Sequence, residues 1–184
     1  SEVAMAAVDA GATIVNDVSA GIDDKDMFQF VAETGVGVVL MHRRLLPCED
    51  KYSDQYKEDP KSHDIVGDII AWLSDRVNVA IKIGVQSNRI AIDPGLGFGK
   101  SVEQNWQIVE QIDRFHELGH PIYIGASRKS FLGATAQIDE PTHRDEVSCV
   151  AAFEMATKGA QIFRVHDVSG HAQMLQSLSS FNNL

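Results

Sequence analysis

The sequence has few cysteines, little positive charge and no long hydrophobic run, and each shortage excludes a class of protein. Its two cysteines, Cys48 and Cys149, fit neither a zinc nor a redox spacing, so we expect free thiols in a cytoplasmic protein. With 16 Lys and Arg against 26 Asp and Glu, the formal net charge is −10, which argues against nucleic acid and against an anionic membrane surface as partners. No apolar stretch approaches the ~18 residues of a membrane span, and no secretory signal is visible.

What is present is an ordinary globular composition, with 44% hydrophobic and 23% charged residues. We expect residues 1–184 to form a single domain with a hydrophobic core. Short apolar stretches predict strands at 12–15, 36–41, 89–93, 122–125 and 161–165. Helical patterns are predicted around them, at 2–10, 24–33, 64–84, 102–117, 144–158 and 171–179.

The alternation of strands and helices predicts an α/β fold with parallel strands, because every connection is long enough for a right-handed crossover. Two architectures fit: an open doubly wound sheet, or part of an eight-stranded barrel. A complete barrel needs about 250 residues, so five strands would leave it three strands short. In both architectures, ligands bind at the carboxyl ends of the strands.

The most distinctive stretch is 90–100, Ile-Ala-Ile-Asp-Pro-Gly-Leu-Gly-Phe-Gly-Lys. Asp93 ends the predicted strand, because Pro94 cannot donate to a ladder. Three glycines at alternate positions allow the next loop to take positive φ and to approach a ligand. Ser101 and Gln104 then have the spacing of a capping box, which begins a helix. The pattern predicts a site at a strand end, and a tight turn with a capping Asp fits the spacing equally well.

Polar residues lie at the ends of the other strands too: Asn16, His42, Lys129 and the pair Arg164 and His166. Because parallel strands end at one common mouth, we expect these groups to converge. Arg164 and His166 are two residues apart and therefore point to the same side of a strand. A guanidinium beside an imidazole suits phosphate oxygens, whereas a single Arg would more simply form a salt bridge.

The types of these residues indicate a polar, anionic ligand. Asn16 and Asp93 can bind the N–H and N/O edge of a heterocycle. The sequence Ser-Arg-Lys-Ser at 127–130 places cations and hydroxyls where a helix could begin, although a basic surface loop is the simpler alternative. His42 and Asp17 are expected to shape loops.

Other features qualify this reading. We expect His143 and His171 at the surface. The charged segment 42–60 is predicted to be a lid or a binding loop. No nucleophile triad and no metal spacing is visible, which favours positioning and charge neutralisation over covalent catalysis.

Five motifs, in order, resemble those of the dihydropteroate synthase family: Asn16-Asp17-Val18-Ser19, Met41-His42, Asp93-Pro94-Gly95-Leu96-Gly97-Phe98-Gly99-Lys100, Ser127-Arg128-Lys129-Ser130 and Arg164-Val165-His166-Asp167-Val168. The resemblance implies a TIM (β/α)8 barrel, of which this chain would contribute a partial barrel of five parallel strands, family strands 4–8. It also implies a transferase of folate biosynthesis. Such an enzyme joins 6-hydroxymethyl-7,8-dihydropterin diphosphate to 4-aminobenzoate and releases diphosphate.

The resemblance also implies roles for single residues, with Lys129, Arg164 and His166 as the catalytic set. Aminobenzoate would contact Phe98 and Ser127, and diphosphate would contact Arg164 and His166. Mg²⁺ is implied as a cofactor, but its ligand loop is absent here, so no metal ligand is expected in this chain. Two copies could pair through their last helices. The implied pterin site consists of Asn16, Val18, Met41, Asp93, Gly125 and Lys129.

Two departures from the family pattern qualify the resemblance. The family's first three strands are absent, so we expect residues 1–184 to be a fragment that is unstable or inactive alone. Residues 43–47, Arg-Arg-Leu-Leu-Pro, replace a more usual glycine-containing loop. The alternatives are a pterin-binding methyltransferase barrel of the methyltetrahydrofolate–corrinoid type, which has no use for a diphosphate clamp, and a non-catalytic pterin-binding remnant.

Overall fold

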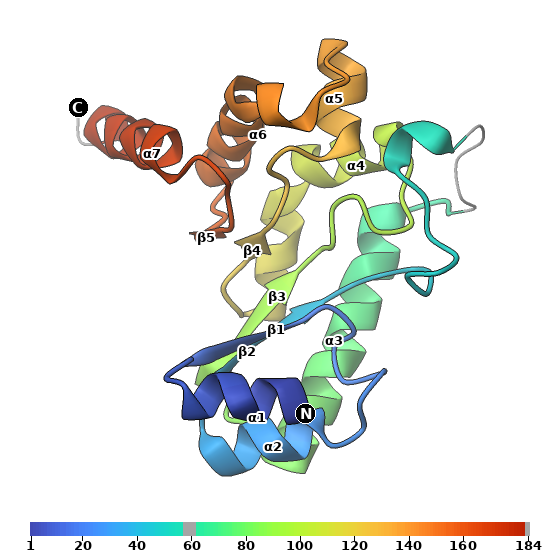
Figure 1. Cartoon of the computed structure of the whole chain (residues 1–184), viewed down its shortest axis with the longest axis vertical. Coiled ribbons are helices and arrows are strands. Elements are labelled where there is room, and N and C mark those ends of the chain that lie inside the picture. Colours follow the sequence, from blue (N-terminus) through green and yellow to red (C-terminus); the bar gives the residue numbers. More distant parts are fainter. Residues whose placement is uncertain (57–61, 183–184) are drawn as a thin grey trace.

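The computed structural model describes residues 1–56 and 62–182 and shows an α/β fold with parallel strands (Figure 1). In this part of the chain the strands are β1 (Ile14–Asp17), β2 (Gly37–Met41), β3 (Ile90–Asp93), β4 (Tyr123–Ile124) and β5 (Ile162–Phe163). The helices are α1 (Glu2–Asp9), α2 (Met27–Thr34), α3 (Ile65–Ile83), α4 (Val102–Glu110), α5 (Ser130–Ala136), α6 (Asp145–Thr157) and α7 (Val168–Asn182). Short 3₁₀ helices cover Ser53–Gln55, Ser87–Arg89, Ile112–Leu118 and Pro141–His143.

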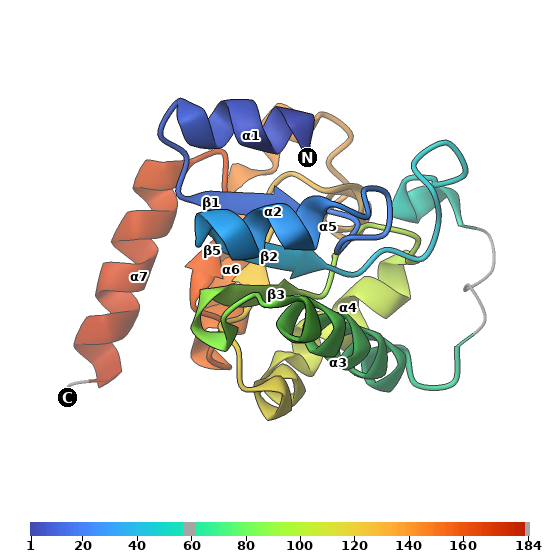
Figure 2. The ribbon, with the colours of Figure 1, turned by 90° about the horizontal axis from the view of Figure 1, so that it is seen from below.

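The strands are neighbours in chain order. β1, β2 and β3 form one parallel sheet, and β4 and β5 form a second parallel pair. A single parallel bridge between Ile92 and Ile122 connects the two groups. In Figure 2 the arrowheads of β1 and β2 point to the side that carries the segment after β2. The predicted parallel arrangement is therefore confirmed.

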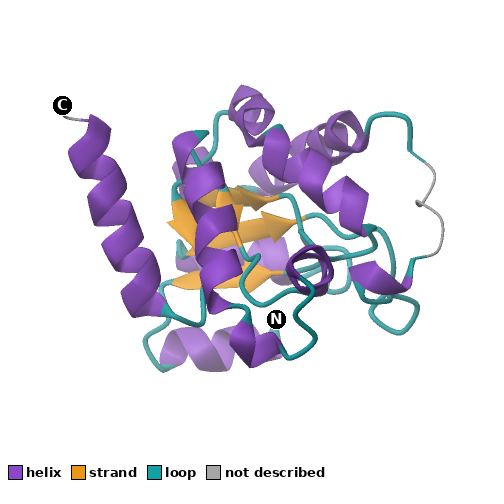
Figure 3. Cartoon of the chain, turned by 90° about the horizontal axis from the view of Figure 1, so that it is seen from above, coloured by secondary structure: helices purple, strands orange, loops and turns teal. Residues whose placement is uncertain are grey.

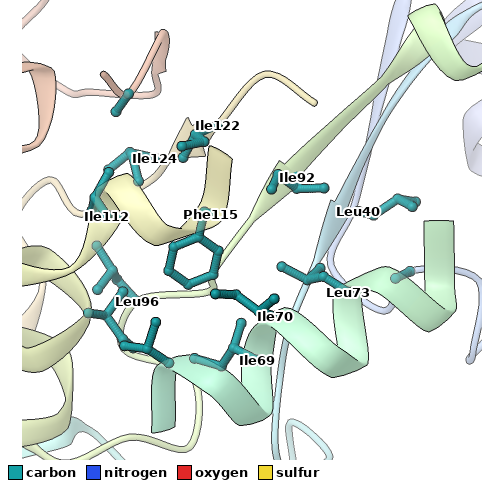
Figure 4. Packing of buried hydrophobic residues seen from close by; sticks show 14 of the residues in the cluster. Leu40, Ile69, Ile70, Leu73, Ile92, Leu96, Ile112, Phe115, Ile122 and Ile124 are labelled. Atoms are coloured by element: carbon teal, nitrogen blue, oxygen red, sulfur yellow. The ribbon is translucent and has the colours of Figure 1, made fainter. Parts of the chain in front are cut away.

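The hydrophobic core lies between one face of the strands and the helices that cover it (Figure 4). Leu40 of β2, Ile92 of β3 and Ile122, just before β4, point to this side and are fully buried. Ile69 and Leu73 of α3 meet them at the helical spacing that the sequence shows. Each such side chain contributes about 1.5–3 kcal/mol on burial, so this face fixes α3 against the sheet.

The opposite face of the strands carries the polar residues. Side chains alternate along a strand, so the neighbours of the core positions point the other way. Asn16 is in register with Val39, and Met41 is in register with Asp93, one residue away from the core positions. Figure 3 shows loops gathering at the tips of the strand arrows. Asn16, Met41 and Asp93 thus share one face near the end where the loops lie.

The expectation for His171 is wrong. This side chain is 3% exposed, and its Nδ1 lies 2.7 Å from the carbonyl oxygen of Asp167. The reason is that α7 begins at Val168, three residues earlier than predicted, and packs against α6. His143 is exposed, as predicted.

Three further findings concern the helices and the thiols. The helix predicted at 102–117 ends at Glu110 and continues, after Gln111, as the 3₁₀ helix Ile112–Leu118. Cys48 and Cys149 are free thiols. No helix among residues 1–56 and 62–182 combines the length and the hydropathy needed to cross a membrane.

Candidate functional site

The loop after β3 is shaped by its aspartate and its glycines. The Asp93 carboxylate turns back and accepts the N–H of Gly95 at 2.7 Å. Gly95 has φ +69°, and a Cβ there would lie 1.8 Å from the carbonyl oxygen of His42. The other two glycines of the loop also have positive φ. Ser101 and Gln104 make both bonds of a capping box at the start of α4, so this part of the sequence analysis is confirmed.

Lys100 holds the glycine loop from beneath, a role that the sequence analysis missed. Its side chain is fully buried, and Nζ donates to the carbonyl oxygens of Gly95 at 2.7 Å and Phe98 at 2.9 Å. Burial lowers the pKa of Lys100 well below its usual value, the neighbouring Lys129 ammonium lowers it further, and Asp93 opposes both effects. The loop conformation therefore depends on an amino group that water does not reach.

Lys129 lies just before α5, and its side chain contacts the same glycine loop. Its Nζ lies 4.2 Å from the centre of the Phe98 ring and donates to the carbonyl oxygen of Leu96. Burial lowers the pKa of Lys129 to about 8, with Asp93 acting in the opposite direction. Burial likewise raises the pKa of Asp93, and Lys129 is the main charge that opposes this shift. An ammonium and a carboxylate thus face each other where water is scarce, and polar groups of a ligand would interact strongly with both.

Arg164 extends this group of charges. Its backbone N–H donates to the carbonyl oxygen of Ile124 at 2.8 Å, which continues the pairing of β4 with β5. The guanidinium lies over Gly125, where a Cβ would come within 2.7 Å of Nη2. Its positive charge acts on Tyr123 and Asp93. A side chain at position 125 would therefore require the Arg164 guanidinium to shift.

His166 is held by Ser127. Its Nδ1 lies 2.9 Å from the Ser127 Oγ, and its backbone N–H donates to the same oxygen at 3.2 Å. Both residues line a cavity of about 960 Å³, together with Phe98 and Lys129. The structure therefore brings the implied aminobenzoate residues and two of the implied catalytic residues into one space.

The remaining predicted residues lie beside this cavity or apart from it. Asp93, Gly125 and Arg164 do not line it but adjoin it through the interactions described above. Met41 is 2% exposed and in register with Asp93. Asn16 is exposed and lines a different cavity, of about 610 Å³, next to α1. Val18 is 40% exposed, and neither Asn16 nor Val18 lines the 960 Å³ cavity.

The Asp17 side chain shapes its loop, as predicted, whereas the His42 ring packs against α3. The buried His42 ring packs edge-on against Trp72, with 5.0 Å between ring centres. Burial lowers its pKa to about 2, and two nearby cationic side chains add to the effect. The Asp17 carboxylate accepts the backbone N–H and the hydroxyl of Ser19 and the N–H of Gly21. The Asp17 carboxylate therefore stabilises its own loop, and the His42 Nδ1 has no hydrogen-bond partner among the described residues.

The segment after β2 contributes residues that the sequence analysis did not single out. The described part of the predicted loop 42–60 ends at residue 56, and 57–61 lie outside the described residues. Asp50 and Tyr52 line the 960 Å³ cavity. Their signal in the sequence was only the charge and length of the segment. Asn105, a buried polar residue in α4, had no signal at all, because an Asn in a helix usually indicates an exposed face.

The described side chains do not fit the implied magnesium ion. Among residues 1–56 and 62–182, no three His, Cys, Asp or Glu side chains come together in a way that could hold a metal ion. Mg²⁺ prefers several oxygen ligands in octahedral geometry, and carboxylates usually provide them. We therefore derive no step of the chemistry through a metal held by these residues.

Comparison with known proteins gives relatives for this arrangement. A dihydropteroate synthase of Mycobacterium leprae is 39% identical over 186 residues, a match that covers 98% of this chain and 64% of that protein. A "Folate synthesis bifunctional protein" of Arabidopsis thaliana is 41% identical over 91% of this chain and 36% of its own length. The chain thus spans about two thirds or less of the relatives it matches.

Solved structures agree with the sequence relatives. The Xanthomonas albilineans dihydropteroate synthase with 4-aminobenzoic acid superposes on all of this chain and 62% of its own, with a TM-score of 0.88 and 34% identity. The same enzyme in complex with 7,8-dihydropteroate gives a TM-score of 0.89. Residues 1–166 match the profile of the family described as "Pterin binding enzyme". Because this match covers most of the 184 residues, the chain belongs to the family of pterin binding enzymes.

Proposed function

We propose that the chain is the pterin-binding part of a dihydropteroate synthase, a transferase of folate biosynthesis. It would join 6-hydroxymethyl-7,8-dihydropterin diphosphate to 4-aminobenzoate. The observation that carries the proposal is the single cavity lined by Phe98, Ser127, Lys129 and His166, with Asp93 and Arg164 beside it. Relatives at 39% identity carry this name, and a neighbouring structure binds 4-aminobenzoic acid.

In this proposal the pterin ring lies against the polar face of the strands. The buried Asp93 carboxylate accepts ring N–H groups, while the Lys129 ammonium reaches the ring carbonyl. Met41 and Gly125 line the slot, and Asn16 and Val18 meet the ring from the β1 side. Because neither residue lines the 960 Å³ cavity, the ligand itself would bridge the cavity and the β1 side.

The reaction needs no protein nucleophile. The amine nitrogen of aminobenzoate attacks the pterin methylene carbon, the carbon–oxygen bond to diphosphate breaks, and the bonding electron pair leaves with diphosphate. The amine nitrogen then loses one proton to solvent. Arg164 and His166 hold the diphosphate and neutralise the charge that grows on it, which is the main contribution expected of this chain.

We also propose that these five strands are part of an eight-stranded TIM barrel whose other strands complete the fold. Ile14 is 59% exposed and Ile162 is 37% exposed, and both lie on the polar-face side of strands at the two ends of the strand order. Such exposed apolar side chains on unpaired edge strands normally have a cover. Diphosphate release by residues 1–184 alone, at a rate near that of a full-length synthase, would refute this proposal.

Two further expectations go with the proposal. Val150 and Phe153 on α6 are 69% and 39% exposed, which supports pairing of two copies through the last helices. Light scattering of the purified protein tests this directly.

A cytoplasmic location agrees with two free thiols, and fractionation of cells that express the protein would check it.

The decisive experiment compares Arg164→Ala with Arg89→Ala, a variant of an exposed arginine far from the mouth. Binding of the pterin diphosphate and of the same pterin without diphosphate is measured by calorimetry. Loss of charged hydrogen bonds costs about 1.5–3 kcal/mol. Arg164→Ala should therefore raise the dissociation constant of the pterin diphosphate roughly 10- to 100-fold and leave that of the pterin without diphosphate unchanged. If Arg164→Ala binds each of the two pterins as tightly as wild type does, the result would instead favour the methyltransferase-type barrel.

A further inference from the structure

We propose that Asp50 is a positioning residue for the aminobenzoate subsite, which it serves by fixing the glycine loop and by adding negative charge beside Lys129. The inference rests on the proposed function. It concerns a segment in which this chain departs from the usual family loop, and none of the motifs that carry the resemblance includes Asp50. Two sets of contacts and the charge of Asp50 connect it to this subsite.

The first set of contacts joins Asp50 to the glycine loop. Its two carboxylate oxygens lie 3.0 and 3.1 Å from the backbone nitrogen of Gly99, and Oδ1 also accepts the hydroxyl of Tyr56 at 3.0 Å. The backbones approach closely here, since a Cβ on Gly99 would lie 2.7 Å from the Cβ of Arg44. A charged acceptor on a loop N–H is one of the stronger hydrogen bonds in proteins, so Asp50 holds Gly99 in place.

The second set of contacts fixes the segment that carries Asp50. Ser53 is 1% exposed, and its N–H donates to the Ser130 Oγ at 2.9 Å. The Ser53 Oγ accepts Asn105 Nδ2 at 3.0 Å, and Asn105 Oδ1 accepts the N–H of Gly97 at 2.6 Å. The segment after β2, the glycine loop and the start of α5 are therefore connected through buried hydrogen bonds. Asp50 is thereby placed at the cavity wall.

The third element is charge. Lys129 and Asp50 line the same cavity, and Lys129 carries the ammonium nearest to the Phe98 ring. Burial is the main effect on the pKa of Lys129 and lowers it, while the negative charges of Asp93 and Asp50 oppose that shift. Removal of the Asp50 charge should therefore lower the pKa of Lys129 further. The protonated ammonium is the form that attracts the carboxylate of aminobenzoate.

The test uses Asp50→Asn, Asp50→Ala and the matched control Asp75→Asn, whose side chain is exposed on α3. In the purified full-length enzyme we expect KM for 4-aminobenzoate to rise at least tenfold in Asp50→Ala and less in Asp50→Asn, which keeps an acceptor for Gly99. The dissociation constant of the pterin diphosphate should stay within twofold of wild type. The alkaline limb of kcat/KM should move to lower pH in both Asp50 variants, by roughly half to one pH unit.

Hydrogen exchange at the Gly99 amide provides a readout that does not depend on activity. Exchange should accelerate in Asp50→Ala and remain unchanged in Asp75→Asn. Unchanged Gly99 exchange in Asp50→Ala, or a KM and pH profile equal to wild type, overturns the inference. Equal losses of thermal stability, pterin binding and kcat would also overturn it, because they indicate a merely structural role. If the full-length wild-type enzyme condenses no substrates, the proposed function fails, and Gly99 exchange still decides whether Asp50 holds the loop.

Discussion

His42 provides a quantitative test of the packing beneath the glycine loop. The ring is buried against Trp72, and burial lowers its pKa from 6.5 to about 2. Below pH 6.5 the His42 side chain is therefore protonated in the unfolded chain but stays neutral in the folded chain. Stability from this residue is complete above pH 6.5 and falls by about 1.4 kcal/mol per pH unit below it. Relative to pH 8, the loss of stability from His42 at pH 4.5 amounts to about 2.7 kcal/mol.

The assay is urea unfolding of wild type and His42→Phe at half-unit steps from pH 8 to pH 4.5. Phe keeps an aromatic contact with Trp72 but cannot be protonated. The free energy of unfolding of the variant, minus that of wild type, should therefore rise by about 2.7 kcal/mol as the pH falls from 8 to 4.5. His143→Gln, at an exposed position, controls for the loss of a histidine and should run parallel to wild type. Parallel curves for His42→Phe would refute the reasoning.

Three other substitutions test the loop itself by thermal or urea unfolding. Lys100→Met removes two hydrogen bonds to loop carbonyls and should lower the free energy of unfolding by about 3 kcal/mol or more. A loss below 1 kcal/mol would show that Lys100 does not hold the glycine loop. Gly95→Ala places a Cβ against the carbonyl oxygen of His42 and should cost about 3 kcal/mol, with substrate binding lost as well; near-wild-type stability would show that the turn can rearrange. Ser101→Ala breaks the capping box with Gln104 and should lower the free energy of unfolding by about 1 kcal/mol. An unchanged free energy of unfolding would show that the capping box does not stabilise α4.

The glycine loop shows how far the sequence alone could predict the site. Pro94 after Asp93 requires the strand to end, and alternate glycines accommodate positive φ, so both features could be read without coordinates. The Ser101 capping box was equally local. These predictions are confirmed because each depends on interactions among residues a few positions apart.

The short strands and α7 mark the limit of that approach. β4 and β5 have two residues each, because pairing with a neighbour, rather than apolar content, determines where a strand ends. His171 was expected at the surface, yet it is buried, since packing against α6 decides which side of α7 is covered. Neither property is contained in the local pattern.

The sequence by itself determined the order of strands and helices, the parallel direction of the strands and the glycine turn, because these follow from hydrophobic periodicity, connection length and backbone sterics. Only the tertiary structure decided that Asp50 bonds to Gly99 across 49 positions, that Ser53 and Asn105 connect three segments, and that Asn16 stands apart from Lys129. The physical reason is that hydrogen bonds and desolvation between distant segments depend on how the chain packs. Packing is a property of the whole fold and leaves no periodic signal in the sequence.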